Sequence, residues 1–488
     1  MKHGSTYLFV VCIACALLAN CSKKEVPVLQ VFDTDNNKMV ILTGEKTNLV
    51  NFYNADFVIL GGSMGGIAAA ISICSSGRTA ILVEETDRIA GCFSYQDTSY
   101  ISDNSFIDSS GSSISYQMFR SKIKKWYADR SQKPPEFYSE YFHYFDDFGS
   151  NNICFETEAA LDVINEMLEE NIKKGKLTVL KRLKVAKAVS FYNRISSLIA
   201  VDLDNKVAHQ LTGWMYIDAT RTGDLIPIIG IRRSTGHESR EQTGEPHAPE
   251  APDSLVGLNI LYYKNPYKSN KEMRNRSFEV ELYDKPREDG AQKLNVFRKP
   301  RRIRSRKIIT EQDIAAEFNE GPRARFFEDS VGIGFQPIHL ERGPHESDHV
   351  MFKTKPFQIP LGALLPIKYN NVIFGSGNIG TTYIASTAYD SPSIRWAIGE
   401  AAGEAAAFCA GKKIYTDELT DKIMYTKGLQ IRLVRRRGIP IFWYDDVKPS
   451  DDDFVEAQLK PFEEPEFRES LTTLSYRNSV KNQQQSTQ

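Results

Sequence analysis

The sequence has almost no excess charge of either sign, because 61 lysines and arginines face 62 aspartates and glutamates in 488 residues. A chain with balanced charge creates no overall field that attracts nucleic acid or another polyanion, so we expect no nucleic-acid partner. The densest basic run, RRIRSRK at residues 301–307, is local. A solvated face or a loop near a substrate explains such a run better than a nucleic-acid patch.

Long hydrophobic runs are also missing, since no segment is apolar enough over about 20 residues to cross a bilayer. At the N-terminus a basic start precedes a short apolar run over residues 7–18, which is typical of a secretory signal. The run ends in Leu18-Ala19-Asn20-Cys21, which resembles the lipobox of bacterial lipoproteins. We therefore expect a lipoprotein signal peptide over residues 1–21 and lipidation of Cys21. A signal that is simply cleaved is the alternative.

A lipidated Cys21 would place the mature protein at the cell envelope, as a periplasmic or outer-membrane lipoprotein whose only membrane contact is its lipid. Cysteine is otherwise scarce, and the four residues that follow the predicted signal lack the spacing of metal ligands. They are Cys74, Cys92, Cys154 and Cys409. The sequence therefore predicts no metal site and no particular disulfide, and burial as small hydrophobic residues explains most of these cysteines.

The sequence does contain a strand–turn–helix–strand pattern over residues 56–85, DFVILGGSMGGIAAAISICSSGRTAILVEE. Residues 57–60 form a continuous apolar run, which is typical of a strand buried on both faces of a parallel sheet. A helix is expected from about residue 65 to 75, and a second strand over residues 79–83. This βαβ unit predicts an α/β fold with a Rossmann-like domain.

The turn GGSMGG follows the spacing of a dinucleotide-binding turn, in which the first glycine permits the turn and the third permits close packing. Serine replaces the central glycine, and we expect its hydroxyl to donate to a phosphate. Glu84 ends the second strand 23 positions after Gly61, where an acid accepts ribose hydroxyls and disfavours NADP. The predicted dinucleotide contacts are Gly61, Gly62, Ser63, Gly65, Gly66 and Glu84. A packed turn without a ligand is the alternative.

Two later segments, YIDATRTGDL at residues 216–225 and VIFGSGNIGTT at residues 372–382, repeat the pattern of a strand that runs into small residues. These segments resemble parts of a family of bacterial FAD-dependent oxidoreductases, which are often secreted and some of which are labelled xanthan lyases. Five further blocks carry the same resemblance: CFETEAALDVINEML, TGEPHAP, RARFFEDSVGIG, KPFQIPLGALLP and RWAIGEAAG. The resemblance covers about residues 54–412.

This resemblance implies FAD as the cofactor and a Rossmann-like FAD-binding domain with an inserted α+β substrate domain. It adds further expected FAD contacts, which are Gly223, Asp224, Asn378, Gly380 and Thr381, and it implies that the helix around residues 399–403 faces the flavin. The expected segments are a signal at 1–21, a tail with a hairpin at 22–53, the FAD-binding domain at 54–232 with an insertion at about 95–150, a substrate or cap domain at 233–350, the return of the FAD-binding domain at 351–412, and a partly disordered extension at 413–488.

The sequence departs from this family where relatives tend to have histidines. Asn104, Tyr383 and Pro392 stand at three such positions, Cys92 replaces a glutamine, and one histidine is moved to position 339. An enzyme that takes hydride from an alcohol needs a base for the hydroxyl proton, and histidine suits this role near neutral pH. The flavin cradle is thus expected to be retained, while the imidazoles expected near the substrate are mostly replaced.

The remaining candidates for catalysis are His247 in GEPHAP, His339 in PIHLER, and Tyr383 as a base or a hydrogen-bond donor to the substrate. For each histidine a structural role is the alternative. The other histidines after the signal are expected at the surface: His143, His209, His237, His345 and His349. We expect Arg395 to bind a carboxylate or to pair with a glutamate at position 400 or 404.

The leading hypothesis is an FAD-dependent oxidoreductase at the cell envelope that transfers hydride between flavin and a hydroxyl-bearing substrate. A small-molecule or carbohydrate substrate is implied by the family context, and the electron acceptor is not identified. A flavin-assisted polysaccharide lyase is one alternative. A non-catalytic FAD-binding envelope protein is another, and the replaced histidines favour it.

Overall fold

A computed structural model describes residues 28–36, 38–94, 98–134, 150–252, 301–341 and 349–486. The predicted signal with Cys21 lies outside the described residues, as do His143, His345 and the side chains of Cys92 and His349. Within the described residues, no helix is long and apolar enough to cross a membrane.

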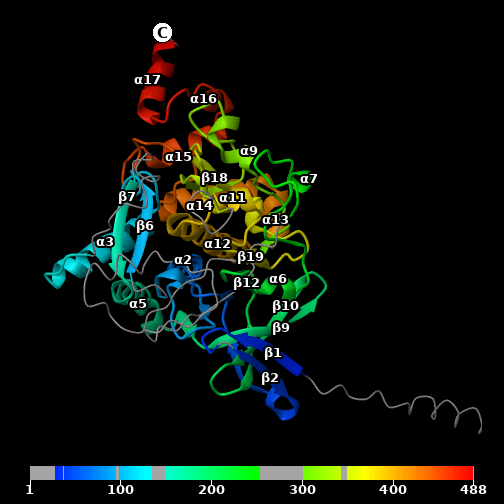
Figure 1. Ribbon diagram of the computed structural model, residues 1–488. Coiled ribbons are helices and arrows are strands. Elements are labelled where there is room, and N and C mark those ends of the chain that lie inside the picture. Colours follow the sequence, from blue (N-terminus) through cyan, green and yellow to red (C-terminus); the bar gives the residue numbers. More distant parts are fainter. Residues whose placement is uncertain are drawn as a thin grey trace, which may run out of the picture.

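A five-stranded sheet forms the centre of the molecule (Figure 1). Its strands run in the order β19 (Val372–Phe374), β12 (Met215–Asp218), β4 (Phe57–Leu60), β5 (Ala80–Val83) and β8 (Leu177–Leu180). All four pairings are parallel, and every residue of β4, β5, β12 and β19 is buried. A parallel sheet of this kind needs a cover on both faces, which explains its continuous apolar strands. The predicted α/β, Rossmann-like fold is confirmed.

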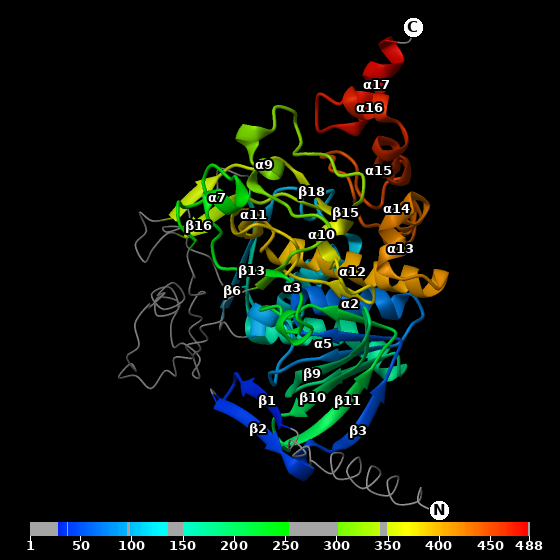
Figure 2. The same cartoon turned by 90° about the vertical axis from the view of Figure 1, so that its right-hand side faces the viewer.

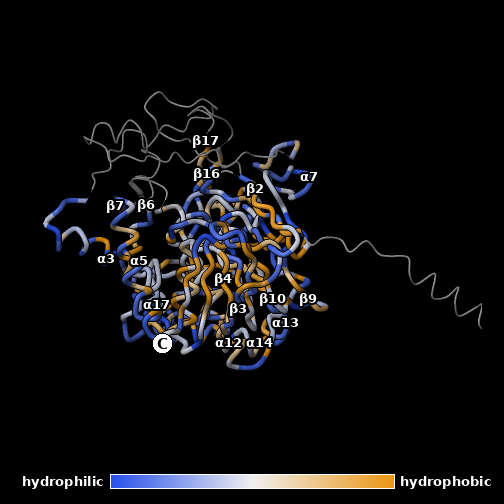
Figure 3. Tube along the Cα trace, turned by 90° about the horizontal axis from the view of Figure 1, so that it is seen from below, coloured by the Kyte–Doolittle hydropathy of each residue, from blue (hydrophilic) through white to orange (hydrophobic). Residues whose placement is uncertain are grey.

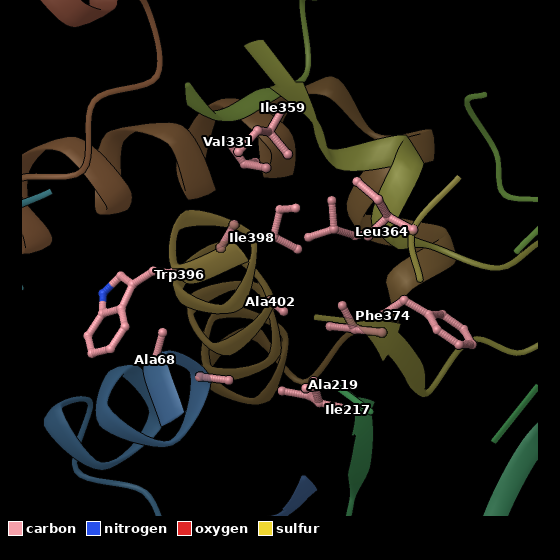
Figure 4. Packing of buried hydrophobic residues seen from close by; sticks show 14 of the residues in the cluster. Ala68, Ile217, Ala219, Val331, Ile359, Leu364, Phe374, Trp396, Ile398 and Ala402 are labelled. Atoms are coloured by element: carbon pink, nitrogen blue, oxygen red, sulfur yellow. The ribbon is translucent and has the colours of Figure 1, made fainter. Parts of the chain in front are cut away.

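Two helices of small residues pack against each other beside this sheet. They are α2 (Met64–Ser75), which connects β4 to β5, and α12 (Pro392–Lys412). A Cβ atom on Gly399 would lie 2.1 Å from the Gly65 carbonyl oxygen, and one on Gly403 would lie 2.7 Å from the Ala69 carbonyl oxygen. Figure 4 shows Ala68 of α2 facing α12. The glycines and alanines therefore allow the two backbones to approach closely.

A second sheet has four strands in the order β3 (Leu49–Asn54), β11 (Val207–Thr212), β10 (Arg194–Asp202) and β9 (Leu183–Phe191). The hairpin of β1 (Val28–Asp33) and β2 (Lys38–Thr43) packs on it through Leu29, Val31, Val40 and Leu42. In Figure 2 this hairpin and sheet occupy the lower end of the molecule. Thr34, Asp35 and Asn36 form the turn that follows β1.

The predicted insertion contributes β6 (Thr98–Asn104), which pairs with β7 (Ser150–Glu156), and α3 (Ile114–Asp129). The fully buried Arg120 of α3 fixes this unit, because its Nη1 lies 2.9 Å from Oδ2 of Asp103 and its Nε lies 2.6 Å from Oδ1 of Asp108. The helix α5 (Thr157–Lys173) follows β7 directly.

Residues 225–388 contribute further short strands and helices. The strands pair as β13 (Arg233–Thr235) with β14 (Arg301–Ile303), β15 (Ser330–Gly334) with β18 (Phe357–Pro360), and β16 (Ile338–Glu341) with β17 (His349–Phe352). The helices are α6 (Leu225–Ile228), α7 (Arg240–Thr243), α9 (Glu311–Ile314), α10 (Leu361–Leu364) and α11 (Tyr383–Ala388). The predicted domain boundaries stay predictions.

The C-terminal extension is helical, where the sequence predicted partial disorder. Its helices are α13 (Thr416–Asp421), α14 (Ile423–Arg437), α15 (Phe454–Glu463), α16 (Pro465–Glu469) and α17 (Tyr476–Ser486). The polar residues of α17 are held by specific partners: Arg477 pairs with Asp451 and Asp453, and Tyr476 packs on Phe467. Composition alone does not show such partners, and partial disorder of this extension stays a prediction.

Candidate functional site

The candidate cofactor site lies at the carboxyl edge of the central sheet, where the strand order reverses. The chain passes from β4 to β5 on one side, whereas β12 and β19 lie on the other side of β4. Ligands of open α/β sheets bind in the crevice at such a switch point. The segments that start here are Gly61–Gly66 after β4, Glu84 after β5, Ala219–Asp224 after β12 and Gly375–Thr381 after β19.

The glycines of the first turn are required by packing. Gly61 has a φ of +91°, and a Cβ atom on it would lie 2.7 Å from the Ala219 carbonyl oxygen. A Cβ atom on Gly66 would lie 1.9 Å from the Gly61 carbonyl oxygen, and one on Gly65 would lie 2.0 Å from the Gly375 carbonyl oxygen. The turn therefore brings the backbone of α2 against the segments that follow β12 and β19, as a dinucleotide turn requires.

Ser63 uses its hydroxyl within the protein, which differs from its expected role as a phosphate donor. The hydroxyl donates to the Ala219 carbonyl oxygen at 2.7 Å and accepts from the Gly66 amide at 3.3 Å, so it is the N-cap of α2. The segment Gly61–Gly65 also matches the Gly-x-Ser-x-Gly pattern of hydrolase nucleophiles. A hydroxyl occupied in this way is not positioned as a nucleophile, so phosphate binding at this turn depends on backbone amides.

Glu84 is buried directly beside the glycine turn. Its Oε2 accepts from the Gly62 amide at 2.6 Å, and its Oε1 accepts from the Thr86 amide at 2.9 Å. Burial raises the pKa of this carboxyl from 4.5 to about 7, although these hydrogen bonds lower it. An acid held at the end of the second strand suits the hydroxyls of an adenosine ribose.

The segment Gly375–Thr381, which follows β19, carries polar atoms that have no hydrogen-bond partner among the described residues. Nδ2 of Asn378 donates to the Asp218 carbonyl oxygen at 3.1 Å, which fixes the side chain. Its Oδ1 and the hydroxyl of Thr381 are buried, and neither has a hydrogen-bond partner among the described residues. Buried polar atoms need partners, and a polar ligand would supply them. Together with Glu84 and the amides at the start of α2, these atoms fit FAD.

Other predicted contacts have structural partners instead. A Cβ atom on Gly380 would lie 1.7 Å from Oγ of Ser305, so this glycine permits packing against the segment after β14. Gly223 has a φ of +62° and starts the turn into α6. The Asp224 carboxylate accepts from the Thr222 hydroxyl and has Arg301 at 3.7 Å. Contact of Gly223, Asp224 and Gly380 with the cofactor stays a prediction.

Two features of this cradle were not identified from the sequence. Asp218 is fully buried at the end of β12, where its carboxylate accepts from the amides of Thr220 at 2.9 Å and Leu225 at 3.0 Å and thereby shapes the following turn. Ala90 has a φ of +98° and donates its amide to the Gly62 carbonyl oxygen at 2.9 Å. The only signals were an acid at the end of an apolar strand and a small residue before Gly91.

The buried acids predict a pH dependence of stability. Burial raises the pKa of Glu84, Asp218, Glu245 and Glu400 to about 7 in each case. The native state therefore keeps protons that the unfolded chain releases near pH 4, so the free energy of unfolding falls as the pH rises toward 7. The loss is at most about 2 kcal/mol per group between pH 5.5 and 7.

Urea denaturation of the protein without cofactor at pH 5.5 and at pH 8 measures this effect. The Glu84→Gln variant is the control, because it removes one of the titrating groups and should give a shallower pH dependence. Equal or greater stability at pH 8 would contradict the prediction.

His247 lies against a fully buried acid. Its Nδ1 is 2.8 Å from Oε2 of Glu311, and its backbone amide donates to Oε1 of the same residue at 3.0 Å. Its ring packs on Phe352 with the centroids 4.0 Å apart. A carboxylate beside Nδ1 holds the proton there and leaves Nε2 as an acceptor, which is the arrangement of an oriented base.

A chain of hydrogen bonds connects this pair to the cofactor segment. Oε1 of Glu245 accepts from the Thr382 hydroxyl at 2.6 Å and from the Glu311 amide at 2.8 Å. Thr382 follows Thr381 of the cradle and is the N-cap of α11. The His247–Glu311 pair and the cradle are therefore parts of one connected structure.

Tyr383 begins α11 and packs on His237, with ring centroids 3.5 Å apart. Its amide donates to Oε2 of Glu238 at 2.9 Å, and the buried Arg302 donates to the same oxygen at 2.8 Å. Burial raises the pKa of Glu238, but the Arg302 guanidinium and the hydrogen bonds from the Tyr383 amide and Ser234 together outweigh this, so the pKa is lowered. The sequence missed His237, for which the only signal was the adjacent acid.

His339 is not brought together with His247. In the β16–β17 ribbon Ile338 is opposite Phe352 and His339 is opposite Met351. Opposite residues point to the same face and neighbours to opposite faces, so His339 points away from the face on which Phe352 contacts His247. The amide of His339 donates to the Thr387 hydroxyl at 3.1 Å.

Three sequence expectations require correction. His209 is buried, with its Nε2 3.6 Å from Oδ2 of Asp202, and His237 is half-buried, so neither is a surface histidine. Arg395 pairs with Asp390 and not with either glutamate. Glu404 instead pairs with two arginines of α14, and Glu400 accepts from the Ser115 hydroxyl.

The parallel sheet, the glycine turn and the buried acid together define a dinucleotide-binding protein of Rossmann type. The family model described as FAD dependent oxidoreductase matches residues 56–299 and 288–433. The chain therefore belongs to the FAD dependent oxidoreductase family, and its cofactor is FAD. A search of the curated proteins finds no match.

Solved structures with a similar fold include a geranylgeranyl bacteriochlorophyll reductase-like protein from Thermoplasma acidophilum, with 10% identity, a TM-score of 0.32 and coverage of 88% of this chain and 96% of that chain. A 3-ketosteroid-delta4-(5alpha)-dehydrogenase from Rhodococcus jostii has 10% identity, a TM-score of 0.33 and coverage of 73% and 97%. A glycerol-3-phosphate dehydrogenase from Bacillus halodurans, complexed with FAD, has 13% identity, a TM-score of 0.21 and coverage of 34% of this chain and 34% of that chain.

Proposed function

We propose that this family member is an FAD-dependent oxidoreductase of the cell envelope that transfers hydride between the flavin and a hydroxyl-bearing substrate. The observation that carries the proposal is His247, which the fully buried Glu311 orients and which hydrogen bonds connect to the cofactor segment. We propose carbohydrates as the substrate class to test first. Cys21, as the lipidated residue, would hold the protein at the envelope.

When bound, FAD supplies the two-electron redox chemistry that no side chain provides. In the direction of alcohol oxidation, Nε2 of His247 takes the hydroxyl proton while the hydride leaves the carbon, and a carbonyl forms. Glu311 keeps the imidazole in the required tautomer and stabilises its protonated form. Tyr383 supplies a hydroxyl to orient the substrate, and Arg302 and Glu238 hold the start of α11 in place.

The His247–Glu311 pair is the reason to prefer catalysis over a purely structural use of FAD. A structural histidine needs a hydrogen-bond partner, but it does not need a fully buried carboxylate whose own backbone amide is held by Glu245. Glu245 also accepts from the Thr382 hydroxyl, which follows the cofactor segment. The substitution of the other expected histidines therefore leaves one base with a defined orientation.

Anaerobic mixing of the purified, flavin-loaded protein with a panel of sugars and simple alcohols tests the proposal. The expected result is loss of the oxidised-flavin absorbance together with formation of a carbonyl product. An unsaturated product without net flavin reduction would indicate a lyase. An unchanged spectrum with every substrate, in either redox direction, would indicate a non-catalytic FAD-binding protein.

A further inference from the structure

The outer face of the β1–β2 hairpin exposes a row of apolar side chains. In its register Val28 is opposite Thr43, Gln30 is opposite Ile41, and Phe32 is opposite Met39. The exposed fractions are 56% for Val28, 37% for Phe32, 46% for Met39 and 56% for Ile41. None of these six outward side chains is charged, whereas the solvated face of a sheet is usually polar.

This exposure does not result from a loosely held hairpin. The alternate residues Leu29, Val31, Val40 and Leu42 are buried against the second sheet. Arg182 pairs with the fully buried Asp33 at 2.9 Å and with Asp35 at 2.9 Å. The hairpin is therefore docked firmly, and its outer apolar face is a fixed surface of the molecule.

We propose that this outer face, formed by Val28, Phe32, Met39 and Ile41, seats on the bilayer surface and fixes the orientation of the protein on the membrane. The proposal rests on the envelope anchoring proposed above. Cys21 precedes Val28 by seven residues, which span at most about 25 Å. A lipid on Cys21 would hold the hairpin within that distance of the membrane, where even a weak apolar affinity becomes effective.

Contact of the hairpin with the membrane would fix the orientation of the proposed catalytic residues relative to the bilayer. In Figures 1 and 2 the hairpin lies at one end of the molecule, and α9 and α11, which carry Glu311 and Tyr383, lie toward the other end. Figure 3 views the molecule from the hairpin end. The substrate side would then face water, which suits a soluble hydroxyl-bearing substrate and not a lipid.

Tryptophan fluorescence of the full-length lipoprotein in vesicles tests the proposal. Phe32→Trp places a reporter on the hairpin, and Phe318→Trp is the matched control, since Phe318 has 38% exposure and follows α9 at the other end. In vesicles of phosphatidylcholine and phosphatidylglycerol, brominated lipids are expected to lower the added emission of Phe32→Trp at least about twofold and to leave that of Phe318→Trp unchanged.

Equal quenching at the two positions, or none at either, would overturn the proposal. Loss of the Phe32→Trp quenching in the additional variant Ile41→Ser would support the apolar face as its cause. Self-association that Ile41→Ser abolishes, without quenching, would assign the face to a second copy and would also overturn the proposal. The Cys21→Ser variant reports on the lipid anchor, and flavin reduction measured in the same samples reports separately on the proposed reaction.

Discussion

Replacement of Gly65 by valine is expected to abolish FAD binding and to prevent formation of a stable native state. Even a Cβ atom at this position would lie 2.0 Å from the Gly375 carbonyl oxygen. Neither backbone can move freely, because Gly65 also contacts Gly399 of α12 and belongs to the turn after β4. A clash of this size between buried backbones costs about 3 kcal/mol or more, a large part of the stability of a typical domain.

Flavin content per protein and the melting temperature measure this effect. Gly411→Ala is the control, because Gly411 lies in the last turn of α12 with nothing within 4 Å of an added Cβ atom. That substitution is expected to raise stability slightly, by up to about 1 kcal/mol, since alanine favours a helix more than glycine does. A Gly65→Val protein that is soluble, yellow and unchanged in melting temperature would show that the turn is described wrongly.

Replacement of His247 by glutamine is expected to lower kcat by about 10²–10⁴-fold with little change in flavin content. The imidazole is the proposed acceptor of the substrate proton, whereas the atoms expected to hold the cofactor belong to other segments. Steady-state kinetics and a flavin spectrum measure both results.

Two matched variants show whether the effect belongs to the oriented pair. Glu311→Gln is expected to lower kcat as well, because an amide that donates to Nδ1 favours the wrong tautomer. His339→Gln is expected to leave kcat within about twofold, since this residue points to the opposite face of the β16–β17 ribbon. A large loss of kcat in His339→Gln, without one in His247→Gln, would identify His339 and not His247 as the base.

Local sequence patterns were enough to predict the cofactor half of the molecule. The apolar run of β4, the glycine turn and the spacing to Glu84 each depend on neighbours within one βαβ unit. The hydrogen-bond partner of the Ser63 hydroxyl was not predictable in this way, because the acceptor, the carbonyl oxygen of Ala219, lies 156 positions further along the chain. A polar atom in a turn has several possible partners, and the fold determines which one it finds.

The same limit applies to the catalytic candidates. His247 could be named from its residue type, but the acid that orients it is 64 positions away in an unremarkable helix of four residues. His237 was assigned to the surface because the sequence does not show that Tyr383 packs on it. The contacts of Tyr476 and Arg477 with residues 446–453 also depend on tertiary packing, so the sequence alone does not show them.

The order of the strands in the central sheet has a consequence for biosynthesis. β4 is made early, but β12, which lies beside it, comes from residues 215–218, and β19, which lies beside β12, comes from residues 372–374. The first βαβ unit therefore has an unpaired sheet edge while much of the chain is still being synthesised. Asn378 and Thr381 follow the last of these strands. We therefore expect flavin incorporation to be a late event, so that the yield of coloured protein depends on free FAD being present where the complete chain folds.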